Sequence, residues 1–164
     1  KLAQKLEPYN LMWIEDPFPR FGSTMGTLAK LTAEIETPVC VGENLTRAEF
    51  RELFERGATD LIMPDICYTG GILEMKKIAA IADTYHIPIC PHNYLGPIST
   101  MANIQICTCI PNFVVLEFQG GDVSWRDEVL REPIPLKEGH LSVPTKPGLG
   151  VELNKEELVK HLVE

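Results

Sequence analysis

The sequence lacks a long apolar run and has little positive charge. None of its apolar runs approaches the roughly 20 residues that a transmembrane helix needs. Asp and Glu number 23 against 15 Lys and Arg, which gives a formal net charge of −8. Binding to a nucleic-acid backbone depends on clustered positive charge, and no basic stripe is present. We therefore expect neither a membrane nor a nucleic acid as a partner.

The cysteines form no recognisable framework. Their number is odd and no pair has C-x-x-C spacing, which argues against both a set of disulfides and a zinc site. Unpaired thiols are typical of a reducing compartment, so we expect a cytoplasmic protein. The five are Cys40, Cys67, Cys90, Cys107 and Cys109.

What the sequence does contain is a repeated pattern, in which a short apolar run leads to an ionisable residue. Such runs begin roughly 25 residues apart, as is typical of the strands of a parallel α/β sheet. Ligands gather at the carboxyl ends of these strands, so four acids and one histidine would face one pocket, an arrangement that favours a cation. The runs are Leu11–Ile14 before Glu15, Val39–Val41 before Glu43, Leu61–Met63 before Asp65, Ile87–Cys90 before His92, and Phe113–Leu116 before Glu117.

Helical patterns separate the runs. Thr46 and Glu49 form a capping box ahead of an apolar stripe, and Gly70-Gly71 precedes another helix. Residues 96–109 are apolar almost all round, as expected of a helix against a sheet. The inner faces are predicted to be Leu28, Leu31 and Ile35; Phe50, Leu53 and Phe54; and Ile72, Met75, Ile78, Ala79 and Ala82.

The number of strands limits the possible folds. Five units form either an open sheet or the last five-eighths of a (β/α)8 barrel, which usually needs about 250 residues and eight strands. Bare apolar edge strands are prone to aggregation, so each outer strand is expected to have a partner, and we prefer the partial barrel. Residues 1–118 are the predicted partial barrel. Residues 119–164, rich in Gly and Pro, are predicted to form a loop, a short ribbon and a final helix capped by Asn154.

Several motifs in this order resemble the C-terminal barrel of the enolase superfamily. The resemblance is to the mandelate racemase subgroup, and within it to acid-sugar dehydratases of the galactonate dehydratase type. It covers nearly the whole chain. The motifs are Trp13–Pro17, Val41–Asn44, Met63–Asp65, Gly70-Gly71, Pro91–Asn93, Leu95–Pro97, Leu116-Glu117 and Thr145–Glu152.

The resemblance implies a role for each strand-end residue. Glu15 and Glu43 match ligands of a Mg²⁺ ion that also holds the substrate carboxylate, with Asp16 the less favoured acid. His92 matches the general base and Asp65 the acid that orients it. Glu117 matches an acid that hydrogen-bonds the enolate, which requires it to be protonated in a shielded pocket. Candidate substrate contacts are Asn44, Asn93 and Tyr94, the two asparagines being equally plausible as turn formers.

The expected activity is removal of the α-proton of an acid sugar and loss of water, giving a 2-keto-3-deoxy acid. A racemase or epimerase of the same superfamily, an inactive partial barrel, and a flavodoxin-like binding module remain alternatives. The third metal ligand and second acid/base group of the family belong to earlier strands, so we expect the parent enzyme to be longer. The resemblance also implies a homo-oligomer.

Overall fold

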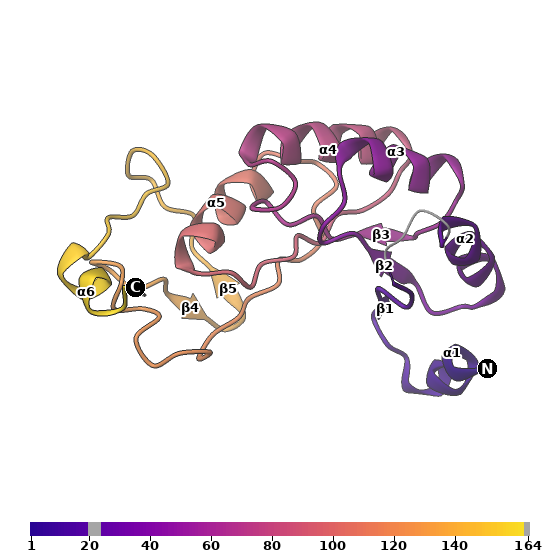
Figure 1. The fold of residues 1–164 in the computed structure, drawn as a ribbon, viewed down its shortest axis with the longest axis horizontal. Coiled ribbons are helices and arrows are strands. Elements are labelled where there is room, and N and C mark those ends of the chain that lie inside the picture. Colours follow the sequence, from indigo (N-terminus) through magenta and orange to yellow (C-terminus); the bar gives the residue numbers. More distant parts are fainter. Residues whose placement is uncertain (20–23, 163–164) are drawn as a thin grey trace.

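The computed structural model describes residues 1–19 and 24–162, in which helices and short strands alternate (Figure 1). The sequence pattern that carries Leu28, Leu31 and Ile35 predicts a helix over residues 23–36, of which residue 23 lies outside the described ranges. The helices are α1 (Leu2–Leu6), a 3₁₀ turn (Glu7–Tyr9), α2 (Met25–Glu34), α3 (Arg47–Glu55), α4 (Ile72–Thr84), α5 (Pro97–Cys107) and α6 (Lys155–Lys160). The strands are β1 (Ile14–Glu15), β2 (Val39–Val41), β3 (Leu61–Ile62), β4 (Leu136–Lys137) and β5 (His140–Leu141).

Five parallel strand segments lie in the predicted order. Strands β1, β2 and β3 form a sheet in which Ile14 pairs with Val39 and Cys40 with Leu61. Single parallel bridges, Ile62 to Ile89 and Ile89 to Phe113, extend the row to the fourth and fifth segments. The order and direction of the predicted strands are confirmed.

The extent of the fourth and fifth strands was predicted wrongly. Segments 87–90 and 113–116 make isolated bridges rather than full ladders. Pro88 and Pro91 are responsible on the fourth segment, because proline has no N–H to donate to a neighbouring strand. The first strand is also shorter than predicted: its pairing begins where the Ile14 N–H donates to the Pro38 carbonyl, and Leu11 stays exposed.

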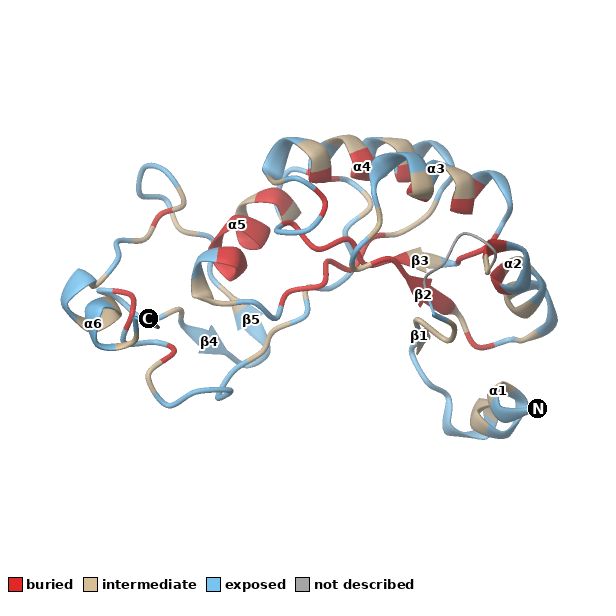
Figure 2. Ribbon diagram, in the orientation of Figure 1, coloured by how far each residue is buried: buried red, intermediate tan, exposed pale blue. Residues whose placement is uncertain are grey.

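Helices α3 and α4 lie side by side along one side of this row of strands, and their buried residues face it, whereas α1 and α6 lie apart from it and have no buried residues (Figures 1 and 2). The capping box of α3 forms as predicted, with Thr46 accepting from the Glu49 N–H and Glu49 from the Thr46 N–H. Phe50 and Leu53 are almost fully buried, and burial of such a side chain stabilises the fold by about 1.5–3 kcal/mol. The predicted inner face of α4 is confirmed except at Ile72, which is exposed in the first turn.

The rhythm of strand and helix stops after the fifth segment. Strands β4 and β5 pair in antiparallel fashion as a small ribbon, as predicted. Asn154 caps α6 by accepting a hydrogen bond from the Glu157 N–H, also as predicted. Gln105 in α5 donates to the Pro144 carbonyl and so ties the region after the ribbon to the helical layer. The division into units 1–118 and 119–164 stays a prediction.

No helix in the described ranges is long and apolar enough to cross a membrane.

Candidate functional site

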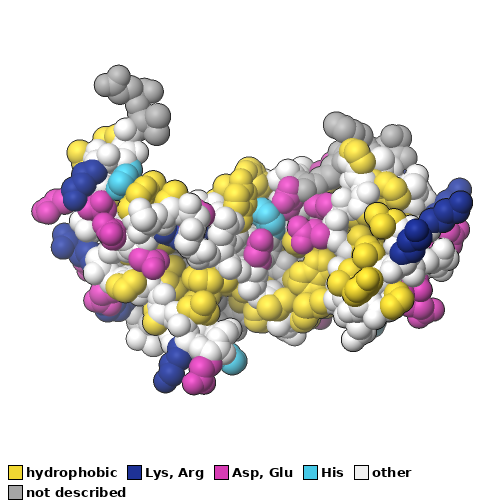
Figure 3. All heavy atoms as spheres, turned by 90° about the horizontal axis from the view of Figure 1, so that it is seen from below, with side chains coloured by type: hydrophobic (Ala, Val, Ile, Leu, Met, Phe, Trp, Pro, Cys, Tyr) yellow, Lys and Arg dark blue, Asp and Glu magenta, His cyan; other side chains and the backbone are white. Residues whose placement is uncertain are grey.

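The carboxyl ends of the strand segments bring ionisable side chains together. Glu43 follows β2, Asp65 follows β3, and His92 and Glu117 follow the fourth and fifth segments. On the face shown in Figure 3, a histidine lies among acidic side chains near the middle of the molecule. The ionisable residues predicted to gather at this edge of the sheet therefore do lie close together.

Asp65 and His92 form a buried pair at the centre of the cluster. Their backbones form a parallel bridge, and Asp65 Oδ2 lies 2.8 Å from His92 Nδ1. Asp65 is 0% exposed, and its other carboxylate oxygen accepts a hydrogen bond of 2.7 Å from the Cys67 N–H. A buried carboxylate against Nδ1 favours the tautomer that carries its proton on Nδ1, and in that tautomer Nε2 is the atom that can accept a proton.

The Nε2 atom of His92 faces further carboxylates. Glu43 Oε2 lies 2.9 Å from Nε2 and Glu117 Oε2 lies 3.8 Å from it. The ring of Tyr94 stands edge-on to the imidazole, with 5.4 Å between ring centroids. Two acids and an aromatic ring thus surround the reactive nitrogen, and Glu43 is close enough to form an ion pair with it when His92 is protonated.

A glycine fixes the point at which Glu43 leaves its strand. Gly42 has φ of +120°, and a Cβ atom there would lie 2.5 Å from the Phe50 ring. Only glycine accommodates both the backbone angle and this close approach of α3. Asp16 Oδ1 accepts from the Gly42 N–H at 3.3 Å, which links the end of β1 to the same turn.

Glu15 lies at the end of β1, the strand next to β2. Its residue partner in the sheet is Cys40, and Trp13 Nε1 donates to Glu15 Oε2 at 3.3 Å. Glu15 is exposed and the side chain of Glu43 is 26% exposed. The two carboxylates that the sequence marks as metal ligands thus come from adjacent strands at one edge of the sheet.

The carboxylates of Glu15 and Glu43 are suitable ligands for Mg²⁺, but two ligands do not complete its coordination sphere. Mg²⁺ takes oxygen ligands in octahedral geometry, and carboxylates are suitable donors. Among residues 1–19 and 24–162, however, no group of three or more His, Cys, Asp or Glu is arranged to hold a metal ion. Glu15 and Glu43 would thus supply two ligands, and the remainder of the coordination sphere would come from elsewhere.

Glu117 and Asn93 depart from what the sequence led us to expect. The Glu117 side chain is 43% exposed, so the described residues do not provide the shielded pocket implied for it. Asn93 is 0% exposed and its side chain is enclosed by protein groups. A substrate contact for Asn93 does not accord with this burial, whereas Asn44 and Tyr94 are exposed.

The polar groups that surround Asn93 were missed in the sequence. Helix α5 carries Ser99, Thr100 and Asn103, all buried, within the stretch that we judged apolar almost all round. The available signal was the presence of three polar residues in a helix too apolar to face solvent. Buried polar groups require hydrogen-bond partners, and Asn93 is the partner of all three.

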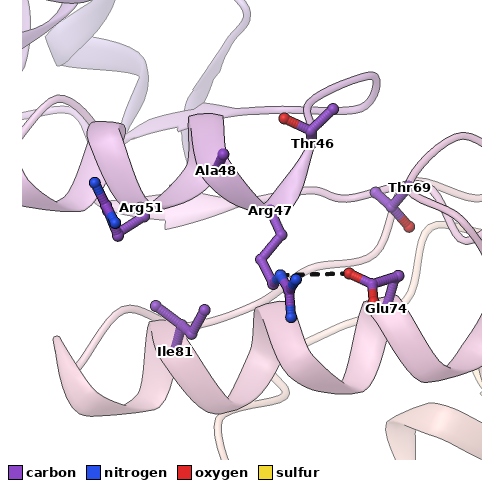
Figure 4. A pocket seen from close by; sticks show the side chains of 7 residues that line it. All are labelled: Thr46, Arg47, Ala48, Arg51, Thr69, Glu74 and Ile81. Atoms are coloured by element: carbon purple, nitrogen blue, oxygen red, sulfur yellow. Dashed lines mark ion pairs between the residues drawn. The ribbon is translucent and has the colours of Figure 1, made fainter.

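Two larger hollows among the described residues lie away from this cluster. One, of about 590 Å³, lies between α3 and α4, where Arg47 forms an ion pair of 3.4 Å with Glu74 (Figure 4). The other, of about 500 Å³, is mainly apolar and lies between the fifth segment, α5 and the ribbon. Neither is lined by His92, Asp65, Glu43 or Glu15.

Parallel strand segments in a row, outer helices, and ionisable residues at the carboxyl ends define this chain as part of a (β/α)8 barrel. The model of the family described as "Enolase C-terminal domain-like" matches residues 1–158. The chain belongs to this family, and its structural relatives are mandelate racemase/muconate lactonizing enzymes.

Comparison with known proteins supports the same assignment. D-xylonate dehydratase of Haloferax volcanii is 40% identical over 166 residues, covering 100% of this chain and 40% of the relative. Arabinonate dehydratase of Saccharolobus solfataricus is 32% identical over 152 residues, covering 92% of this chain and 40% of the relative. A solved mandelate racemase/muconate lactonizing enzyme-like protein from Rubrobacter xylanophilus has a TM-score of 0.91 at 38% identity, covering 99% and 41% of the two chains. The chain thus spans about 40% of the length of the curated relatives it matches.

Proposed function

We propose that this chain supplies the base and two metal ligands of a Mg²⁺-dependent acid-sugar dehydratase. The observation that carries the proposal is the buried Asp65–His92 pair, whose Nε2 opens toward Glu43 and Glu117. The similarity to D-xylonate and arabinonate dehydratases supports an acid sugar as substrate. The reaction would convert a hydroxylated carboxylate into a 2-keto-3-deoxy acid.

His92 removes the α-proton in this proposal. The Asp65 carboxylate holds the imidazole through Nδ1 and stabilises the positive charge that develops when Nε2 accepts the proton. As the C–H bond breaks, its electron pair is delocalised into the substrate carboxylate. That pair then forms the carbon–carbon double bond as the bond to the β-hydroxyl breaks.

The leaving group needs a proton. After the first step, His92 carries one at Nε2, on the same face of the substrate from which the α-proton came. Transfer of this proton to the departing hydroxyl gives water and restores the neutral imidazole. Tautomerisation of the resulting enol then gives the 2-keto product.

Three glutamates stabilise the charge that develops on the substrate. Glu15 and Glu43 would hold Mg²⁺, which when bound supplies Lewis-acid stabilisation of the substrate carboxylate. Glu117 would donate a hydrogen bond to the developing enolate oxygen, which requires it to be protonated and covered from water. Asn44 and Tyr94 would contact substrate hydroxyls, since both are exposed beside the cluster.

The setting of the enzyme is part of the same proposal. A small carboxylate substrate, a homo-oligomer and a cytoplasmic location follow from the family likeness and from the thiols. The cysteines of the chain are free, which supports a reducing compartment.

The test is an acid-sugar assay on the full-length protein that contains these residues. Xylonate, arabinonate and galactonate are each incubated with Mg²⁺ or with a chelator, and the 2-keto-3-deoxy product is quantified. We expect Mg²⁺-dependent product from at least one sugar. Deuterium incorporation into recovered substrate without product would identify an epimerase or racemase instead, and no reaction with any sugar would contradict the proposal.

Variants of the strand-end acids identify the metal ligands. We expect Glu15→Gln and Glu43→Gln to weaken Mg²⁺ binding at least tenfold, measured by calorimetric titration. Asp16→Asn is the matched control, because the amide oxygen still accepts the Gly42 N–H. Equal Mg²⁺ affinity in all three variants would remove the two glutamates from the proposed ligand set.

A further inference from the structure

We propose that Asn93 is a positioning residue that holds Glu117 beside His92, and that helix α5 holds Asn93 in turn. The inference rests on the proposed function, because it assigns Asn93 to the acid and base of that reaction. The observation behind the proposal is that the fully buried side-chain amide of Asn93 is hydrogen-bonded to both the fifth strand segment and α5.

Asn93 makes two hydrogen bonds to the same residue. Its backbone N–H donates to Glu117 Oε2 at 2.8 Å, and its side-chain Nδ2 donates to the Glu117 carbonyl at 2.9 Å. One bond fixes the carboxylate and the other fixes the main chain that carries it. A group needed only to join two segments would require the second bond alone.

The Asn93 bonds take the place of backbone hydrogen bonds that are missing between the fourth and fifth strand segments. The fourth and fifth segments pair through a single bridge, Ile89 to Phe113, and the Glu117 N–H reaches the Pro91 carbonyl at 3.3 Å. Pro91 has no N–H to return. The Asn93 side chain therefore supplies a donor to the fifth segment near the position at which the backbone ladder is interrupted.

Helix α5 satisfies the rest of the Asn93 amide. Nδ2 also donates to Thr100 Oγ1 at 3.2 Å, and the Thr100 hydroxyl in turn donates to the Gly96 carbonyl at 3.1 Å. Oδ1 accepts from Ser99 Oγ at 3.4 Å and from Asn103 Nδ2 at 3.1 Å. An asparagine side chain offers two donor hydrogens and an oxygen with two lone pairs, and all four capacities are used here.

This pattern demands asparagine specifically. An aspartate at position 93 has nearly the same shape but no side-chain donor. Its carboxylate oxygen would lie against the Glu117 carbonyl oxygen, and two acceptors form no hydrogen bond. The carbonyl would lose its partner, and the fifth segment would lose the bond that fixes its end. The backbone N–H of residue 93 would still donate to Glu117 Oε2, but the main chain that carries this carboxylate would lose its restraint, so the position of Glu117 relative to His92 Nε2 would be less closely fixed.

The kinetic test is a double-mutant cycle in the full-length enzyme. Asn93→Asp and Asn93→Ala are combined with Glu117→Gln, and kcat and KM are measured for the sugar that the enzyme dehydrates. We expect the Asn93 variants to lower kcat on the order of 10²-fold, the cost of a misplacement of about 1 Å, with little change in KM. In the Glu117→Gln background the same substitutions should lower kcat less than threefold further. Full additivity would overturn the proposal, since a merely structural residue would act independently of Glu117.

A second measurement does not depend on catalysis. Hydrogen exchange of residues 113–118, followed by mass spectrometry, reports whether Asn93 restrains this segment. We expect at least tenfold faster exchange in both Asn93 variants, and no change in Ser99→Ala, which loses only the longest bond of the network. Unchanged exchange in the Asn93 variants would overturn the proposal even in an active enzyme. Faster exchange in an enzyme that dehydrates no acid sugar would uphold the positioning of Glu117 and refute the proposed function.

Discussion

The centre and the edges of the strand row differ in how completely this chain encloses them. At the centre, Asp65 and His92 are buried, and both carboxylate oxygens of Asp65 and Nδ1 of His92 have protein hydrogen-bond partners. At the edges, Glu15 and Glu117 lie on the outermost segments and remain exposed. The described residues therefore enclose the Asp65–His92 pair by themselves, whereas they leave Glu15 and Glu117 open to solvent.

The same contrast holds for the two asparagines that follow strand-end residues. Asn44 follows Glu43 in a turn and is exposed, whereas Asn93 follows His92 and is enclosed by α5. Similar local sequence thus gives a solvent-facing turn residue in one place and a buried junction in the other. The hydrogen bonds to polar side chains of α5 are what enclose Asn93.

The largest expected effect comes from the centre. We expect Asp65→Asn to lower kcat of the full-length enzyme on the order of 10²–10⁴-fold, because an amide cannot hold the Nδ1 proton as a carboxylate does. The measurement is steady-state kinetics with the dehydrated sugar. Asp83→Asn, at an exposed position of α4, is the matched control and should leave kcat unchanged. Equal kcat in wild type and Asp65→Asn would remove Asp65 from the mechanism.

Cysteine reactivity distinguishes the buried thiols from the exposed ones. Burial raises the pKa of the Cys40 and Cys90 thiols and raises that of Cys107 to about 12. At pH 8 a thiol with a pKa near 12 has about 10⁻⁴ of its population as thiolate, roughly 10³-fold less than an ordinary cysteine. Alkylation followed by mass spectrometry should therefore modify the exposed Cys67 and Cys109 first. Equally fast modification of Cys40 would mean that β2 is open to solvent.

Core truncation tests the packing that supports the site. We expect Leu53→Ala to lower the free energy of unfolding by about 2–5 kcal/mol, because Leu53 is fully buried between α3 and the sheet. Leu73→Ala in α4, where the side chain is 66% exposed, should change it by less than about 0.5 kcal/mol. Urea unfolding of the two variants measures the difference. Similar losses in both would contradict the burial of the α3 face.

The smallest expected effect is at the cap of α3. We expect Thr46→Ala to cost about 1 kcal/mol, since it removes the hydroxyl that accepts the Glu49 N–H. Thr46→Ser retains that oxygen and should cost much less. Urea unfolding again provides the measurement, and a Thr46→Ala variant as stable as Thr46→Ser would show that the capping box contributes nothing.

Local signals predicted most of the fold. The apolar runs gave the order and direction of five segments, because a buried parallel strand needs apolar side chains on both faces. The capping box at Thr46 and the cap at Asn154 are confirmed because each depends on residues only three apart. The pairing of Asp65 with His92 could be expected because both follow neighbouring segments.

The predictions that were wrong depend mainly on contacts that no local pattern encodes. Ile72 has the right spacing for the buried face of α4 but is exposed in the first turn of the helix. The loss of regular pairing at Pro88 and Pro91 was readable from their missing N–H groups but was not anticipated. Burial of Asn93 depends on three side chains of α5, and no local pattern at Pro91–Tyr94 reveals them.

The most direct test of the central claim is proton exchange followed by NMR in deuterated water. Full-length wild type and His92→Asn are incubated with Mg²⁺ and the acid sugar that the enzyme dehydrates. With His92 as the base, wild type should form the 2-keto-3-deoxy product, and His92→Asn should show neither product nor exchange of the α-proton. An α-proton that exchanges equally fast in His92→Asn would contradict the account, because another group would then be removing it.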